Sequence, residues 1–236
     1  VSSMVLDQLT AEVTQDALLG GRVMLRQPAR GVRAGSDAVL LAAACPARPG
    51  ESVLEIGCAS GAALLCLGAR VADVNLVGLE VQPELAALAK LNASENRMAD
   101  RMRVILADLN AMPEELTGQR FDHVIANPPF FTAQKHGPSP DAGRALARAE
   151  RADNDLRTWV LCMLKMAQPE GRLTVIHRAE RLPDLLLHMT YGSGSATGSV
   201  VGGIEIFPLW PKPGRPAKRI IVRARAELLP PASEET

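Results

Sequence analysis

Apolar residues in this chain occur in two patterns, short continuous runs and longer segments with helical spacing. The short runs have the length and composition of buried β-strands, and helical segments separate most of them. This alternation is typical of an α/β fold with a mostly parallel sheet and helices on both faces. The predicted strands are 52–56, 75–80, 103–107, 121–126, 172–177, 204–207 and 218–224.

Proline and small polar residues mark the beginnings of the predicted helices. Pro83 falls in the first turn of one helix, where its missing N–H removes no hydrogen bond. Ser36 or Asp37 is expected to cap another helix, which ends at Ala44. Together with the apolar spacing, these residues predict helices over 36–44, 62–70, 83–94, 142–152 and 155–167.

The two ends of the chain differ in composition from its centre. Residues 21–33 alternate apolar and basic side chains, which predicts a short hairpin inside an N-terminal segment 1–35. Residues 36–229 are expected to form one α/β domain, because 236 residues can bury a single large core. Within that domain, the Gly-, Ser- and Thr-rich stretch 192–203 is predicted to be a flexible loop. After the domain, residues 230–236 are predicted to be a disordered tail.

The turn after the first predicted strand contains two glycines four residues apart. Gly57 and Gly61 suit a place where the backbone turns tightly and a ligand approaches closely. Dinucleotide-binding loops have the pattern G-x-G-x-x-G, which would require glycine at Ala59 and Ala62, so nicotinamide binding is disfavoured. Ala59 also adds one methyl group where the ligand would lie.

Polar side chains follow four of the predicted strands. In open α/β sheets, ligands bind beyond the carboxyl ends of the strands, so these side chains are expected to line one crevice. Glu80, followed by Val81, can accept hydrogen bonds from both hydroxyls of a ribose, and Asp108 would face an adenine amine. The four strand-end residues are Glu55, Glu80, Asp108 and Asn127.

The motif Asn127-Pro128-Pro129-Phe130 suits the activation of a planar amine. Such an amine is a poor nucleophile because its lone pair is delocalised, and two acceptors aimed at its hydrogens would make the nitrogen pyramidal. Asn127 offers its side-chain oxygen, and Pro128, held extended by Pro129, offers its carbonyl. Phe130 offers a face on which a base can stack. The same residues would also suit an ordinary loop followed by a core aromatic.

Charge and the metal-binding residue types narrow the choice of partners. The net charge is zero, yet six basic residues and no acid lie between Phe207 and Ala226, either as a phosphate-binding track or as a solvated strand face. The four cysteines and four histidines lack metal-ligand spacing, so no metal is expected. No apolar run reaches the roughly 18 residues that cross a bilayer, which favours a cytoplasmic protein.

The acid followed by G-x-x-x-G resembles the glycine loop of S-adenosylmethionine-dependent methyltransferases. With Asn-Pro-Pro-aromatic and the segment 32–41, the chain resembles the bacterial family that methylates an adenine amine beside the anticodon of a valine tRNA. The resemblance covers 22–225 and implies the Rossmann-like class I fold with a seven-stranded sheet. It implies that Asn127, Pro128, Pro129 and Phe130 are catalytic, and that S-adenosyl-L-methionine is held by Glu55, Gly57, Ala59, Gly61, Glu80, Val81, Asp108 and Asn127.

The resemblance also implies an RNA substrate, which is expected to be a tRNA because extruding a base costs less in a single-stranded loop. Three alternatives stay open: another nucleic acid, the planar side-chain amide of a protein glutamine, and a non-catalytic RNA-binding module, which Ala59 keeps possible. The oligomeric state does not follow from the sequence. Candidate RNA contacts are Arg33, Arg144, Arg148, Arg215, Lys218 and Arg219, although Arg144 and Arg148 also suit the solvated face of a helix.

Overall fold

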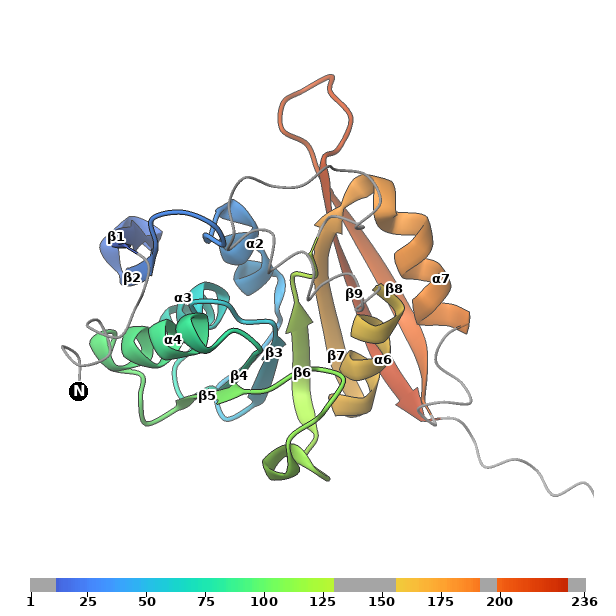
Figure 1. Cartoon of the computed structure of the whole chain (residues 1–236). Helices are drawn as coiled ribbons and strands as arrows, with labels where there is room; N and C mark the ends of the chain where they lie inside the picture. The colour runs from blue at the N-terminus through green and yellow to red at the C-terminus, as the bar shows by residue number, and fades with distance from the viewer. Residues whose placement is uncertain (1–11, 130–155, 192–198, 229–236) are drawn as a thin grey trace, which may run out of the picture.

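The computed structural model describes residues 12–129, 156–191 and 199–228. It is built around a seven-stranded sheet with the strand order β5-β4-β3-β6-β7-β9-β8 (Figure 1). The first five strands in this order are parallel, and β9 and β8 complete the sheet in antiparallel fashion. This confirms the predicted fold class. The strands are β3 (Ser52–Ile56), β4 (Asn75–Glu80), β5 (Met102–Leu106), β6 (Phe121–Ala126), β7 (Ala167–Arg178), β8 (Ser199–Leu209) and β9 (Arg219–Leu228).

Helices cover both faces of the sheet, as a parallel sheet requires. Val53 and Leu54 are neighbours in β3, but they belong to different cores because successive side chains point to opposite faces. On the face of Val53 lie α2 (Ser36–Ala44), α3 (Ala62–Arg70) and α4 (Pro83–Glu95), and on the face of Leu54 lie α6 (Leu156–Met166) and α7 (Leu182–Tyr191). Single 3-10 turns occur at Leu19–Gly21, Glu114–Leu116 and Ala179–Arg181.

The N-terminal hairpin lies earlier in the chain than the sequence pattern predicts. Its strands are β1 (Val13–Leu18) and β2 (Val23–Pro28), which pair with each other and not with the main sheet. The turn between them contains Gly20 and Gly21, both with positive φ, so these two glycines set the position of the hairpin. Only β2 lies within the expected 21–33.

The prediction of a flexible loop over 192–203 is wrong for residues 199–203. Residues 199–203 belong to β8, and Ser199–Gly202 pair with β9 before the register shifts between Gly202 and Glu205. Gly203 has φ +57, so this glycine-rich sequence supports an irregular strand once β9 offers an edge to pair with. Residues 192–198, the predicted helix 142–152 and the predicted tail lie outside the described residues.

The start of α2 also differs from expectation. Its N-cap is Gly35, and the cap makes no side-chain hydrogen bond, so neither Ser36 nor Asp37 caps the helix. The Asp37 carboxylate instead forms an ion pair with Arg219 at 2.9 Å, a partner 182 positions away that no local pattern could indicate. Within the described ranges, no helix is long and apolar enough to span a membrane.

Candidate active site

A pocket of about 380 Å³ lies at the carboxyl ends of β3, β4 and β6. Clefts that hold small molecules typically occupy about 300–1,000 Å³. Pocket-lining positions include most of the predicted site residues, because parallel strands bring their carboxyl ends to one edge of the sheet. Those that line it are Arg33, Glu55, Gly57, Ala59, Glu80, Val81, Asp108, Asn127, Pro128 and Pro129, whereas Phe130, Arg144 and Arg148 lie outside the described residues.

The glycine turn after β3 folds back against β4. The N–H groups of Gly57 and Cys58 both donate to the carbonyl of Leu79, at 2.8 and 3.0 Å. Gly57 has φ +69, and a Cβ at this position would lie 2.6 Å from the ring of Trp159. Glycine is therefore required here by both conformation and space. Ala59 adopts the left-handed region as well, with φ +48, although it carries a Cβ.

Gly61 was expected to hold the cofactor, but it is not among the residues that line the pocket. It lies behind the turn with φ +85, directly before α3. A Cβ there would lie 2.8 Å from the terminal methyl of Met102 and 3.4 Å from Cβ of Ala89. Gly61 thus allows the turn to pack closely against α4 and β5.

The Glu80 carboxylate holds the glycine turn to the end of β4. One oxygen accepts the N–H of Ala59 at 2.8 Å, and the other accepts the N–H groups of Val81 and Gln82 at 3.0 and 2.9 Å. Glu80 is buried and lines the pocket as predicted. These hydrogen bonds fix the direction of its carboxylate, so any ribose contact would be made by a side chain already held in place.

Glu55 lies at the floor of the pocket and is almost completely buried. Burial raises the pKa of its carboxyl well above the ordinary value, and the negative charge of Glu80 adds to this effect, while the Leu64 N–H opposes it. Its Oε2 has no hydrogen-bond partner. A cationic ligand in the pocket would stabilise the charged form of this side chain.

Three of the residues that line this pocket each have a buried polar atom without a hydrogen-bond partner within the described structure. They are Oε2 of Glu55, Oδ1 of Asn127 and Nε1 of Trp159. Leaving such an atom unsatisfied costs about 1–3 kcal/mol, so three beside one cavity point to a ligand that supplies both donors and an acceptor. S-adenosylmethionine carries positive charge that would suit Glu55 and a carboxylate that would suit Trp159, and the Asn127 oxygen would remain for an amine of a second ligand.

The Asn127-Pro128-Pro129 segment is held from the neighbouring strand by His177. Ala126 at the end of β6 pairs with Val175 of β7, which places His177 level with the motif. The His177 ring hydrogen-bonds to the backbone of Pro129, and its Nδ1 accepts the N–H of Arg178 at 2.9 Å. Because Nδ1 is an acceptor, the other ring nitrogen carries the proton and donates to the Pro129 carbonyl.

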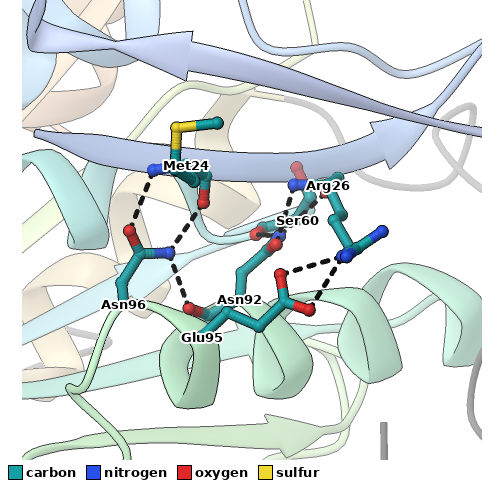
Figure 2. Close-up of polar contacts among 6 residues, drawn as sticks. All are labelled: Met24, Arg26, Ser60, Asn92, Glu95 and Asn96. Atoms are coloured by element: carbon teal, nitrogen blue, oxygen red, sulfur yellow. Dashed lines mark hydrogen bonds and ion pairs between the residues drawn. The ribbon is translucent and has the colours of Figure 1, made fainter. Parts of the chain in front are cut away.

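Asparagine side chains attach the N-terminal hairpin to the same site (Figure 2). Asn92 accepts the N–H of Arg26 at 2.8 Å and donates to the carbonyls of Arg26 and Ser60 at 2.8 and 2.9 Å. Asn96, one turn later in α4, makes the equivalent pair with Met24 of β2 at 2.9 and 2.7 Å. Asn92 is completely buried, so a single amide connects β2 to the glycine turn.

The predicted basic track is partly neutralised by acids from other segments. Arg219 pairs with Asp37, Arg223 pairs with Glu205 at 2.9 Å, and Arg225 pairs with Glu227 at 2.7 Å. Arg33 lines the pocket but pairs with Asp16 of the hairpin at 2.9 Å. In the part of the chain that the structure describes, no ion pair is formed by Arg215 or Lys218, nor by Lys212 near them.

Sequence reasoning missed Trp159, His177 and Asn92. Nothing in the sequence connects Trp159 of α6 with the glycine turn. The sequence around His177 likewise gives no sign that its ring contacts the Asn-Pro-Pro motif. Asn92 and Asn96 had a usable signal, because two amides four residues apart lie among the apolar residues of α4. Within the described ranges, no cluster of His, Cys, Asp and Glu could hold a metal ion.

Comparisons with known proteins agree with this geometry. The family model described as N-6 DNA Methylase matches residues 38–183, which is more than half of the chain. A tRNA1(Val) (adenine(37)-N6)-methyltransferase from Porphyromonas gingivalis is 34% identical over 173 residues, which are 71% of this chain and 67% of that protein. A protein of the same name from a Flavobacteriaceae bacterium is 31% identical, over 61% of this chain and 58% of its own length. The chain thus spans about two thirds or less of these relatives.

Solved structures share the fold at low sequence identity. A protein from Agrobacterium tumefaciens described as a predicted O-methyltransferase has a TM-score of 0.61 and 23% identity, with 80% of each chain covered. TYW2 from M. jannaschii in complex with AdoMet has a TM-score of 0.63 and 11% identity, with 94% of this chain and 89% of that chain covered.

Proposed function

The chain belongs to the amino-methyltransferase family that includes the tRNA1(Val) (adenine(37)-N6)-methyltransferases, and we propose that it methylates the exocyclic amine of an adenine in a tRNA. The methyl donor is S-adenosyl-L-methionine, whose sulfonium supplies an electrophilic methyl group when bound. A tRNA substrate would place the enzyme in the cytoplasm.

One observation supports the proposal: among the described residues, no donor reaches Oδ1 of Asn127, a buried acceptor directly after β6 in a residue that lines the pocket. An amino group of the substrate would supply the missing donor. The proposed roles of the cofactor-binding residues follow from their places along the same pocket. Glu80, the last residue of β4, and Val81 directly after it would contact the ribose. Asp108, after β5, would face the cofactor's adenine amine, and Glu55 would lie nearest the positive charge.

The chemistry requires the chain to reshape the acceptor nitrogen. Asn127 Oδ1 and the Pro128 carbonyl would each accept one amine hydrogen, which directs the nitrogen lone pair toward the methyl carbon. The bound donor would supply its methyl group to this nitrogen, and the Asn127 and Pro128 oxygens would hold the amine as it becomes cationic. The cationic amine then loses one of its hydrogens to solvent, so no general base is needed beforehand. Phe130, the next residue of the motif, would stack on the target base.

RNA as the substrate rests on the relatives' names and on the distribution of charge. Arg33 at the pocket and Arg215 and Lys218 beyond β8 are proposed phosphate contacts, and Arg219 would contribute from its ion pair with Asp37. Phosphate neutralisation makes nucleic-acid affinity depend steeply on salt. The remaining proposed contacts, Arg144 and Arg148, follow the catalytic motif in the sequence.

The proposal is tested by incubating the protein with methyl-labelled S-adenosylmethionine and either total bacterial tRNA or a cell protein extract, followed by nucleoside and amino-acid analysis. N6-methyladenosine as the labelled product is expected, with no label when Asn127→Ala replaces the wild type. Labelled glutamine in the protein arm would show that an amide is the acceptor. Cofactor binding without transfer to either arm would indicate a non-catalytic module.

A further inference from the structure

The turn between β8 and β9, residues 210–218, has features that neither the cofactor pocket nor the catalytic motif uses. It contains Trp210, whose side chain is 62% exposed, the largest exposed fraction among the large hydrophobic residues described. Tryptophan is highly buried on average and is enriched at interfaces, so this exposed ring is a candidate contact for a partner. The same turn contains Lys212, Arg215 and Lys218 and no acid.

The turn is built to be rigid. The Arg215 N–H donates to the Lys212 carbonyl at 3.3 Å across Pro213 and Gly214, and Gly214 has φ +72. Proline followed by a glycine with positive φ is the arrangement of a type II β-turn. Two further prolines, at 211 and 216, restrict the backbone on both sides. A rigid exposed turn loses little conformational entropy when it binds a partner.

This turn brings cations together without neutralising them. Lys212 and Arg215 are the first and last residues of the β-turn, so their Cα atoms lie within about 7 Å of each other. Arg219, Arg223 and Arg225 in β9 all have carboxylate partners, but in the described part of the chain Lys212, Arg215 and Lys218 form no ion pair. Grouped cations of this kind repel each other unless an anion lies between them.

The turn lies at the same edge of the sheet as the pocket, the edge formed by the carboxyl ends of the parallel strands. Arg219 of β9 pairs with Arg178, the last residue of β7, and the Lys218 carbonyl accepts the Ala179 N–H at 3.2 Å. The turn therefore extends past the carboxyl end of β7, and Figure 1 shows it projecting beyond the rest of the molecule. The ion pair between Arg219 and Asp37 joins its base to a residue that lines the pocket.

We propose that the β8–β9 turn is an arm that binds unpaired nucleotides beside the target adenine, with Trp210 stacking on a base and Lys212 and Arg215 contacting phosphates. An aromatic face beside cations is the arrangement that single-stranded nucleic acid binds, because bases stack on the ring and phosphates pair with the charges. The proposal rests on the proposed function, since it concerns the same RNA substrate. It assigns to Trp210 a role in holding RNA, not in methyl transfer.

The test compares RNA affinity among matched variants of the whole chain. Trp210→Ala should raise the Kd for an adenine-containing RNA stem-loop about 10- to 100-fold, and Trp210→Phe should restore most of the affinity. Leu187→Ala is the control, because it removes an apolar side chain that is 52% exposed on α7. Lys212→Gln with Arg215→Gln should lower the slope of log Kd against log salt by about 1.4, at roughly 0.7 for each phosphate contact.

Lys90→Gln with Arg97→Gln is the control for charge, since both residues are exposed at α4, on the opposite half of the sheet from β8. Unchanged RNA affinity in Trp210→Ala would overturn the proposal, and so would a loss of self-association in that variant without a loss of RNA binding. If the wild type methylates RNA and Trp210→Ala binds RNA normally, the role of the β8–β9 turn is refuted but the proposed function is not. If the wild type binds RNA through Trp210 but methylates only protein, the proposed function is refuted but the role of the turn is not.

Discussion

Acid should destabilise this protein through His177, a buried side chain that holds the proposed catalytic motif. His177 is 1% exposed, and burial, together with the positive charges of Arg181 and Arg219, lowers its pKa from 6.5 to about 4. The unfolded chain therefore binds a proton at His177 between these two pH values, whereas the folded protein does not. Stability is complete above pH 6.5 and decreases as the pH falls toward 4.

The size of the effect follows from the difference between the two pKa values. Each pKa unit corresponds to about 1.4 kcal/mol, so a fall from 6.5 to about 4 amounts to about 3 kcal/mol of unfolding free energy. This is a large part of the stability of a typical domain, roughly 5–15 kcal/mol. The loss should begin near pH 6.5 and approach its full value near pH 4.

The assay is urea unfolding at a series of pH values, for the wild type and for His177→Gln. Glutamine has an amide that can donate to the Pro129 carbonyl and does not titrate, so the variant should lose less stability between pH 6.5 and pH 4. Other titrating groups are common to both proteins and cancel in the comparison. Parallel stability curves for the two proteins would refute the buried, neutral state of His177.

Two further predictions concern the cofactor pocket. Binding of S-adenosylmethionine should release a proton from Glu55, because the cofactor's positive charge opposes the raised pKa of this buried carboxyl. Calorimetry should then show a binding enthalpy that depends on the buffer in the wild type but not in Glu55→Gln. A binding enthalpy of the wild type that does not depend on the buffer would contradict this prediction. Ala59 and Arg97 both have a left-handed backbone, with φ of +48 and +57. Replacing either by glycine should raise the unfolding free energy by up to about 1 kcal/mol, because relief of about 1–2 kcal/mol of backbone strain exceeds the entropic cost of glycine. Only Ala59→Gly should change the Kd for the cofactor, because Ala59 lines the pocket; a destabilised variant would show that the left-handed residue is not strained.

The parallel half of the fold was predictable because its signals are local. The strands Ser52–Ile56, Asn75–Glu80 and Phe121–Ala126 are short and mostly apolar, and Pro83 marks the beginning of its helix, so pattern and structure agree at these elements. The polar residues at their ends also come together in one pocket, since the direction of a parallel strand fixes where its carboxyl end lies.

The features that prediction missed depend on contacts between distant segments. β8 begins in a glycine-rich stretch because β9 offers hydrogen bonds, and Asp37 pairs with Arg219 instead of capping α2. The basic residues near the C-terminus formed one track in the sequence, but carboxylates such as Glu205 neutralise part of it. His177 reaches the motif only because β7 lies beside β6, which spacing along the chain does not indicate.

The role of Asn127 is the central claim, and single-turnover methyl transfer tests it most directly. With saturating cofactor and RNA, Asn127→Ala should transfer methyl groups about 100-fold or more slowly than the wild type, because one preorganised acceptor at the reacting nitrogen is lost. The Kd values for RNA and S-adenosylmethionine, measured in parallel, should change much less than the rate. A transfer rate within a few-fold of the wild type would contradict the assignment of this oxygen to the reacting amine.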